Sequence, residues 1–199
     1  MMNDNRVPGM EFLAACRQGD TAEARDCLCR GANPNYRDDT GSTALIEAAR
    51  EGHLGIAELL LEHKAEVNVQ EDIGQYTAIM AAADFGNKDI VQLLIKNKAD
   101  LSIKNVNKET ALMRASRQGH IEIVQLILTE TNGNHINIKN QFDETALTKA
   151  AREGRKEVVG LLLDSGADVN IRSKGKGQGW SPLVWAYAMD QTDIFKMLG

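Results

Sequence analysis

The sequence predicts an all-α repeat fold, a solenoid of stacked helix-turn-helix units joined by β-hairpin loops. A short pattern recurs along the chain, and each copy contains two stretches with apolar residues at helical spacing. Glycines mark the recurrence at intervals of 33, 34, 33 and 35 residues: Gly19, Gly52, Gly86, Gly119 and Gly154. Asp190 takes the equivalent place 36 residues later. Such a period indicates repeats that each pack on their neighbours.

We predict a single repeat domain spanning residues 1–199. It contains six repeats, at approximately 5–37, 38–70, 71–104, 105–139, 140–171 and 172–199. The first and the last depart most from the shared pattern, as the terminal caps of a stacked array do. Extra residues fall between repeats, at Gln75–Tyr76, in TNGNHIN and in SKGKGQG, so length variation is confined to the loops.

The first helix of each repeat begins at a threonine in four copies: Thr43, Thr77, Thr110 and Thr145. A threonine hydroxyl at an N-cap accepts a hydrogen bond from a backbone N–H two or three residues later. Small residues follow, for example Ala48–Ala49 and Ala150–Ala151, and they let a neighbouring helix approach closely. The marker glycine then ends the helix, because it adopts a left-handed conformation without steric cost.

The second helix of each repeat carries an apolar face that a lone helix pair could not bury. Its apolar runs are IAELLL, IVQLLI, IVQLIL and VVGLLL. Neighbouring repeats must therefore cover this face. Short extended stretches follow in KAEVN, KADLS, NHINI and GADVN, with turn residues beyond them, and these predict a hairpin that projects toward the next repeat.

The composition is that of a packed soluble protein. Charged residues make up 26% of the chain and the formal net charge is -5, so no overall positive field favours nucleic acid or anionic lipid. No apolar run approaches the roughly 18 residues of a membrane span, and the start lacks the pattern of a signal peptide. Three cysteines, Cys16, Cys27 and Cys29, suggest reduced thiols. We therefore expect a cytoplasmic protein without membrane contact.

No motif predicts catalysis. The stretch SKGKGQGW has three glycines, but Trp180 follows Gly179 where a Walker loop needs lysine, and the spacing of a dinucleotide fingerprint is missing as well. We therefore interpret this stretch as a flexible loop between repeats rather than as a phosphate site. The histidines and cysteines lack metal-ligand spacing. We predict no enzyme, no catalytic residue, no cofactor, no metal and no small-molecule substrate.

The repeat resembles the ankyrin repeat. The resemblance rests on the 33-residue period, T-A-L in place of the family's T-P-L, AAREGH and ASRQGH at the turn between helices, and the closing GADVN. It covers about residues 9–199. The family's histidine after T-P-L is replaced by Ile46, Met80, Met113, Thr148 and Val184, so only Thr148 offers a hydrogen-bonding side chain there. The alanine in T-A-L and the short chain resemble free-standing bacterial ankyrin-repeat proteins.

The resemblance implies a partner protein that lies along the concave groove and touches hairpin tips and the exposed face of each first helix. The residues at those places are Glu47, Arg50, Glu51, Tyr76, Asp84, Phe85, Arg114, Arg117, Gln118, Phe142, Lys149, Arg152, Glu153, Trp180 and Trp185. We expect arginine and lysine there to pair with acidic partner groups, and the aromatic rings to anchor apolar ones. Two alternatives stay open: Glu51 and Glu153 partly neutralise the arginines, and Trp185 covers the end of the last repeat.

The predicted function is a non-enzymatic interaction module, an adaptor or inhibitor that binds another protein. An alternative is the scaffold portion of a larger protein or of a secreted bacterial effector whose catalytic region is absent from this sequence. Nucleic acid is disfavoured as a partner because the chain is acidic and glutamates accompany the predicted basic residues, which we call the basic column: Arg50, Arg114, Arg117, Lys149 and Arg152. We expect the protein to act as a monomer.

Overall fold

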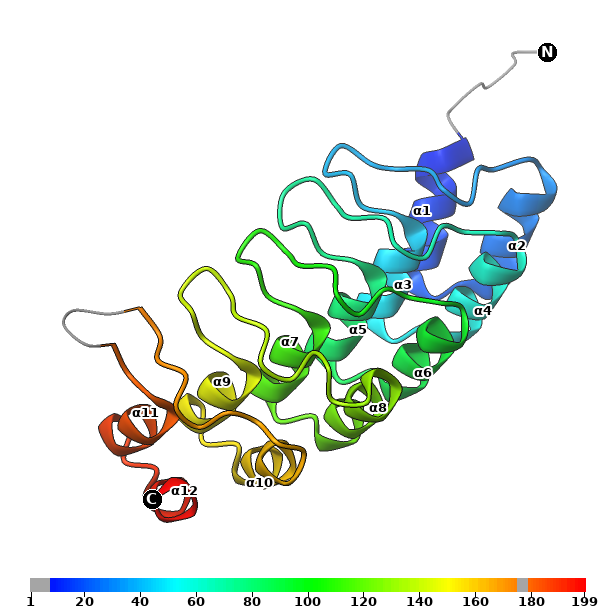
Figure 1. Cartoon of the computed structure of the whole chain (residues 1–199). Helices are drawn as coiled ribbons and strands as arrows, with labels where there is room; N and C mark the ends of the chain where they lie inside the picture. Colours follow the sequence, from blue (N-terminus) through cyan, green and yellow to red (C-terminus); the bar gives the residue numbers. More distant parts are fainter. Residues whose placement is uncertain (1–7, 175–178) are drawn as a thin grey trace, which may run out of the picture. The chain divides into compact units, whose positions relative to one another are not determined.

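The computed structural model describes residues 8–174 and 179–199, and within them it contains twelve α-helices, two for each predicted repeat (Figure 1). The chain divides into two compact units. The N-terminal unit comprises the chain up to Ala82 together with Asp89–Asp100, and the C-terminal unit comprises Ala83–Lys88 together with Leu101–Gly199. The all-α repeat fold is thus confirmed, whereas the extent of a single domain stays a prediction.

The N-terminal unit contains two complete helix pairs and most of a third. Helix α1 packs on α2 and on α3, α3 packs on α4, and α2 packs on α4. The helices are α1 (Pro8–Gln18), α2 (Thr21–Cys29), α3 (Ala44–Glu51), α4 (Leu54–Glu62), α5 (Ala78–Phe85) and α6 (Lys88–Lys96), the last two of which cross the boundary of the unit.

The C-terminal unit contains three helix pairs. The first helices pack in the order α7, α9, α11, and the second helices in the order α8, α10, α12, which gives two layers within this unit (Figure 1). The helices are α7 (Ala111–Gln118), α8 (Ile121–Thr131), α9 (Ala146–Arg152), α10 (Lys156–Asp164), α11 (Pro182–Ala188) and α12 (Thr192–Leu198).

The predicted helix caps form in most repeats. The side chains of Thr43, Thr110 and Thr145 each accept a hydrogen bond from the backbone N–H three residues later. Thr77 differs, because its buried hydroxyl has no hydrogen-bond partner among the described residues. At the other end of the first helix, Asp190 adopts a φ of 56°, the left-handed conformation of the marker glycines whose place it takes.

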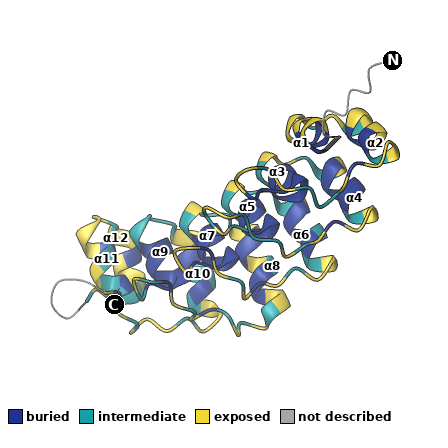
Figure 2. Cartoon of the chain, turned by 90° about the horizontal axis from the view of Figure 1, so that it is seen from above, coloured by how far each residue is buried: buried dark blue, intermediate teal, exposed yellow. Residues whose placement is uncertain are grey.

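The core consists of the small residues of the first helices and the apolar faces of the second. Ala48, Ala49, Ala150 and Ala151 are fully buried. So are the second-helix residues at helical spacing, as Figure 2 shows by colour for α4, α8 and α10. Thr148 forms the expected polar contact, a reciprocal capping box with Thr145. Packing between neighbouring helix pairs therefore supplies the burial that a lone pair could not.

The loops between repeats contain less β-structure than predicted. In the described part of the chain they form only isolated antiparallel bridges, Arg37 with Thr43 and Ser173 with Trp180. Neighbouring loops are nevertheless joined by backbone hydrogen bonds, for example from Gln141 N to Asn107 O at 3.1 Å. Most of the glycine-rich stretch predicted to be a flexible hairpin, residues 175–178, lies outside the described residues.

Candidate partner-binding surface

One pair of positions recurs on the first-helix side of the repeats. It joins the residue immediately before the N-cap to the residue five positions later, and we call it the pre-cap pair. Because the second member lies one turn into the helix on the side of the preceding loop, the two side chains meet. The described pairs in contact are Ser42 with Glu47, Glu109 with Arg114, Glu144 with Lys149, and Trp180 with Trp185.

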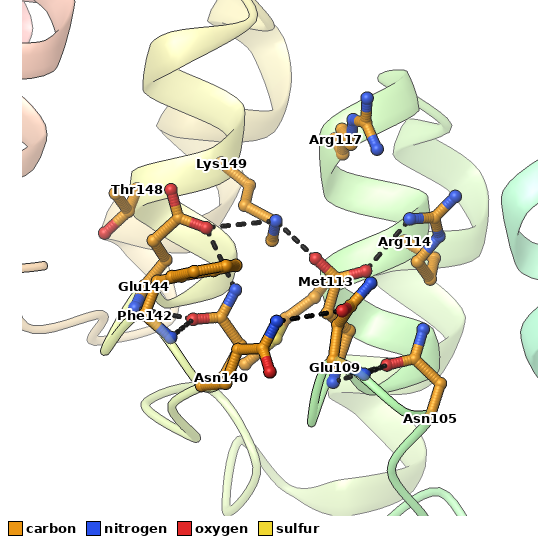
Figure 3. Close-up of polar contacts among 12 residues, drawn as sticks. Asn105, Glu109, Met113, Arg114, Arg117, Asn140, Phe142, Glu144, Thr148 and Lys149 are labelled. Carbon is orange, nitrogen blue, oxygen red and sulfur yellow. Dashed lines mark hydrogen bonds and ion pairs between the residues drawn. The ribbon is translucent and has the colours of Figure 1, made fainter. Parts of the chain in front are cut away.

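The pre-cap pairs of the C-terminal unit are linked into an ionic network (Figure 3). Arg114 Nη1 lies 2.9 Å from Glu109 Oε2, and its other terminal nitrogen contacts Asp84. Lys149 Nζ lies between two carboxylates, in contact with Glu109 and 3.1 Å from Glu144 Oε2. Each glutamate of the network thus bridges two cations.

The network continues toward the edge of α9. Arg152 contacts Glu144 through Nη1 and Glu153 through Nε, at 3.3 Å in the second case. Glu153 also lies 3.7 Å from Arg117. Asp84, Glu109, Glu144 and Glu153 therefore face Arg114, Arg117, Lys149 and Arg152. With equal numbers of both signs, the basic column is neutralised within the C-terminal unit.

The N-terminal unit has a smaller cluster centred on a carboxylate. Glu47 accepts a hydrogen bond from Ser42 Oγ at 2.6 Å and pairs with Arg17 at 3.1 Å and with Arg50 at 2.8 Å. Arg50 continues to Glu71, with Nη2 3.1 Å from Oε2. Here too the column arginines are engaged by carboxylates of the same unit.

The neighbouring cations lower the pKa of two buried carboxyl groups, Glu109 and Glu47. Burial alone would raise the pKa of Glu109, but Lys149 and Arg114 outweigh it and lower the pKa below the ordinary value. Burial likewise opposes ionisation of Glu47, and Ser42, Arg17 and Arg50 together lower its pKa. Both groups are therefore charged near neutral pH, in keeping with ion pairs that lie largely out of water.

The structure corrects the expected exposure of three predicted binding residues. Glu47, Arg114 and Lys149 were expected on an exposed helix face, but they are buried, and only 3% of Lys149 is exposed. The expectation was wrong because hydrogen-bonding and oppositely charged partners cover these side chains: arginines and Ser42 around Glu47, and carboxylates around Arg114 and Lys149. Their role in partner binding stays a prediction.

Trp185 was also expected to be exposed, and the structure shows it half-buried. Its ring lies 4.6 Å from that of Trp180 in an edge-on arrangement, and the Arg152 guanidinium lies 5.3 Å from its centroid. Its indole N–H donates to Ser173 Oγ at 3.1 Å. The expectation failed because the loop before α11 folds onto the ring. An aromatic pair thus occupies the pre-cap positions that carry ions in the two preceding repeats.

The remaining predicted residues lie nearer the surface. Phe85, the last residue of α5, is 59% exposed, as expected. Its neighbour Asp84 is mostly buried, and accepts from Gln118 Nε2 at 2.9 Å. Phe142 is exposed in the loop before α9, and Trp180 is exposed immediately before the N-cap of α11 rather than at a loop tip. Glu51 and Gln118 are exposed, whereas Arg50, Tyr76, Arg117, Arg152 and Glu153 are half-buried.

Sequence reasoning missed the carboxylates that hold the basic column. Glu109 and Glu144 immediately precede the cap threonines Thr110 and Thr145, but only the threonines entered the prediction. The missed signal is the spacing of five residues. A glutamate before the threonine is followed five positions later by an arginine or lysine, as in Glu109 with Arg114 and Glu144 with Lys149. Ser42 and Glu47 have the same spacing.

Two of the four histidines serve contacts between repeats. His53 Nε2 lies 3.1 Å from Arg17 O in the N-terminal unit, and His120 Nε2 lies 3.1 Å from Asp84 O in the C-terminal unit. Arg155 Nε donates to Arg117 O in the same manner, at 3.0 Å. Within residues 8–174 and 179–199, no three His, Cys, Asp or Glu side chains gather as metal ligands would, and no helix has the length and apolarity of a membrane span.

Comparison with known proteins fits these features. The profile of the family described as Ankyrin repeats (3 copies) matches residues 12–105, 69–140 and 112–199. The chain belongs to the ankyrin-repeat family. Among curated proteins, it is 36% identical over 122 residues to a probable E3 ubiquitin-protein ligase, XBOS33, from Oryza sativa subsp. japonica. The match covers 60% of the chain and 17% of that relative. The family indicates a protein-interaction module.

Proposed function

We propose that this ankyrin-repeat protein is a non-enzymatic adaptor or inhibitor, which binds another protein through its first helices and loop tips. The observation that carries the proposal is Phe85, a residue that is 59% exposed at a helix end. In four other repeats this position holds a polar residue: Gln18, Glu51, Gln118 and Glu153. An exposed aromatic ring that joins no core is typical of an interface anchor.

The ionic network narrows the kind of partner. Because Arg114 and Lys149 are already paired with carboxylates and buried, they are poorly placed to attract an acidic peptide. Among the predicted residues of the C-terminal unit, Phe85, Phe142 and Gln118 are exposed and Arg117 is half-buried. A segment with apolar anchors and a few polar groups therefore fits this surface better than a strongly acidic one or a nucleic acid. We propose a monomer that acts in the cytoplasm.

Differential capture tests the proposal. The protein, a Phe85→Glu/Arg117→Glu variant and a Glu157→Ala control would be used in parallel as bait, with quantitative mass spectrometry of the recovered proteins. Glu157 is an exposed residue in the first turn of α10, the second helix of its repeat. We expect a specific partner to be lost only with the double variant. Equal recovery with all three baits, with the fold intact by circular dichroism, would contradict the assignment.

A second candidate function rests on the relative from rice. The matched region amounts to 17% of a probable E3 ubiquitin-protein ligase, so the repeats of this chain would select substrates within a larger ligase-like protein. A ubiquitin-transfer assay with the complete gene product tests this. Transfer to a protein captured through Phe85 supports it, and absence of transfer with that protein as substrate contradicts it.

A further inference from the structure

The outer face of the last repeat carries large apolar side chains that the described residues leave between about a third and three quarters exposed. They belong to α11 and α12, and are Val184, Tyr187 and Phe195. Figure 2 shows these two helices as more exposed than α9 and α10 of the same unit. A face of a stacked array that stays in solvent is normally polar. This face therefore differs from a solvent-facing cap.

The equivalent positions of other repeats are buried. Tyr187 corresponds to Cys16, Ala49, Ser116 and Ala151, each of which is fully buried, whereas Tyr187 is 72% exposed. Phe195 corresponds to Ala57, Val124 and Val159, which are likewise fully buried. In these earlier repeats the next helix pair covers the positions. The last repeat thus presents a packing face in which both residues are larger than their counterparts.

The size of Tyr187 argues against an ordinary repeat as the occupant. Its counterparts are small, and they allow the next first helix to approach closely. The Tyr187 and Phe195 rings lie 5.8 Å apart, tilted by 52°, and together form an aromatic platform. Beside it lies a cavity of about 440 Å³, lined by Ala186, Tyr187, Ala188, Asp190, Gln191, Thr192 and Phe195. A repeat at the usual spacing would meet two rings where the other repeats present small side chains, which favours a different occupant.

The dimensions of the face also argue against a second copy. Both helices have seven residues, so each is about 10 Å long and the pair presents a footprint of about 10 by 20 Å. A stable protein–protein interface buries about 800 Å² on each partner, which this face alone does not reach. One helix laid across the platform, with apolar residues at i, i+3, i+4 and i+7, matches its size and chemistry.

We propose that the α11–α12 face docks an amphipathic helix of a partner protein. The apolar side of that helix covers Tyr187 and Phe195. Asp190 is the one charged residue among those described as lining the cavity, so a lysine or arginine of the partner helix lies beside it. This surface shares no residue with the one assigned to Phe85 and Arg117. The two proposals can therefore be tested independently.

Fluorescence anisotropy with a designed probe tests the docking face. The probe is a labelled peptide of about 15 residues with leucines at i, i+3, i+4 and i+7 and lysines elsewhere, and its control has the same composition in scrambled order. We expect the periodic peptide alone to bind, with amide shifts in an NMR spectrum confined to residues 184–197. Tyr187→Ala/Phe195→Ala should weaken binding roughly tenfold or more, whereas Phe85→Glu should leave it unchanged.

Three results would overturn the docking proposal. They are equal binding of the two peptides, no binding of either, and a dimer in sedimentation experiments that Tyr187→Lys disperses, which would identify a second copy as the occupant. Because Tyr187 is exposed, its replacement should preserve the fold, and circular dichroism checks this. If Tyr187→Ala/Phe195→Ala loses peptide binding but still captures the partner that depends on Phe85, the docking face and the proposed function are distinct.

Discussion

Glu47 in the N-terminal unit and Lys149 in the C-terminal unit occupy the same position of the repeat, four residues after the N-cap threonine. Both are buried, and both are engaged by charged groups of opposite sign. Glu47 lies among arginines and Lys149 lies between glutamates. The burial and the pairing are shared by the two units, while the sign of the charge is inverted.

The comparison teaches that a charge at this buried position is compensated within its own unit, and that the surroundings decide its sign. A buried ion is tolerated only when its partners replace the lost water. In the N-terminal unit, Ser42 before the cap leaves the compensation to Arg17 and Arg50. In the C-terminal unit, glutamates before the cap supply it directly. The first-helix surface is thus electrostatically satisfied before any partner arrives.

The largest expected effect comes from removing the cation at the centre of the C-terminal network. Lys149→Met leaves Glu109 and Glu144 in a buried environment with one cation fewer. Removing one partner of a buried ion pair lowers the free energy of unfolding by about 3–5 kcal/mol. Because Arg114 still pairs with Glu109 and Arg152 with Glu144, we expect a decrease near the lower end of that range. The midpoint of urea unfolding, followed by circular dichroism, measures it.

A double variant sharpens this prediction. Lys149→Met combined with Glu144→Gln removes one charge of each sign, so it should recover about 1 kcal/mol or more relative to the sum of the single variants. Strict additivity of the two single effects would mean that the two side chains do not interact, and would contradict the ionic interpretation of the pre-cap pair.

Acid should affect the central carboxylates of both units in the same direction. The folded-state pKa values of Glu109 and Glu47 lie below the ordinary 4.5, so their ionised forms favour folding. This stabilisation is complete above about pH 4.5 and is lost as the pH falls through the folded-state values. Glu109→Gln and Glu47→Gln should each unfold more easily at pH 7 and show a shallower decline below pH 4.5. Unfolding curves across this range, parallel to those of the unaltered protein, would disprove the assignment.

The sequence predicted the repeats, the helix caps and the buried small residues, because these follow from short-range patterns. Spacing alone placed Phe85 at an exposed helix end. It could not place Lys149 correctly, because a charged residue at helical spacing looks solvated until its carboxylate partners on loops are known. Glu109 reaches Lys149 from the preceding repeat, a contact that depends on how the two helix pairs stack. Trp185 was misjudged for a related reason, since the loop that covers it has an irregular length.

An intermediate effect is expected in the last repeat, where tryptophans replace the ions. Trp185→Phe keeps an aromatic ring against Trp180 but removes the indole N–H that donates to Ser173. One hydrogen bond of this kind contributes about 1 kcal/mol, so the loss should be well below that of Lys149→Met. Since the chain contains only these two tryptophans, intrinsic fluorescence reports the change directly. A decrease in stability as large as that of Lys149→Met would contradict this ranking of the aromatic pair below the ionic network.

The smallest effect is expected for an ion pair that lies in water. Lys156 Nζ is 2.9 Å from Asp193 Oδ2, with both side chains more than half exposed. Its geometry is as good as that of the buried pairs, but solvent screens it and the long side chain loses conformational freedom in forming it. Lys156→Met should therefore leave the unfolding midpoint unchanged within error. Because it deletes the same charge in the same manner as Lys149→Met, it isolates burial as the variable, and a comparable loss at both positions would remove the distinction between the network and ordinary surface charge.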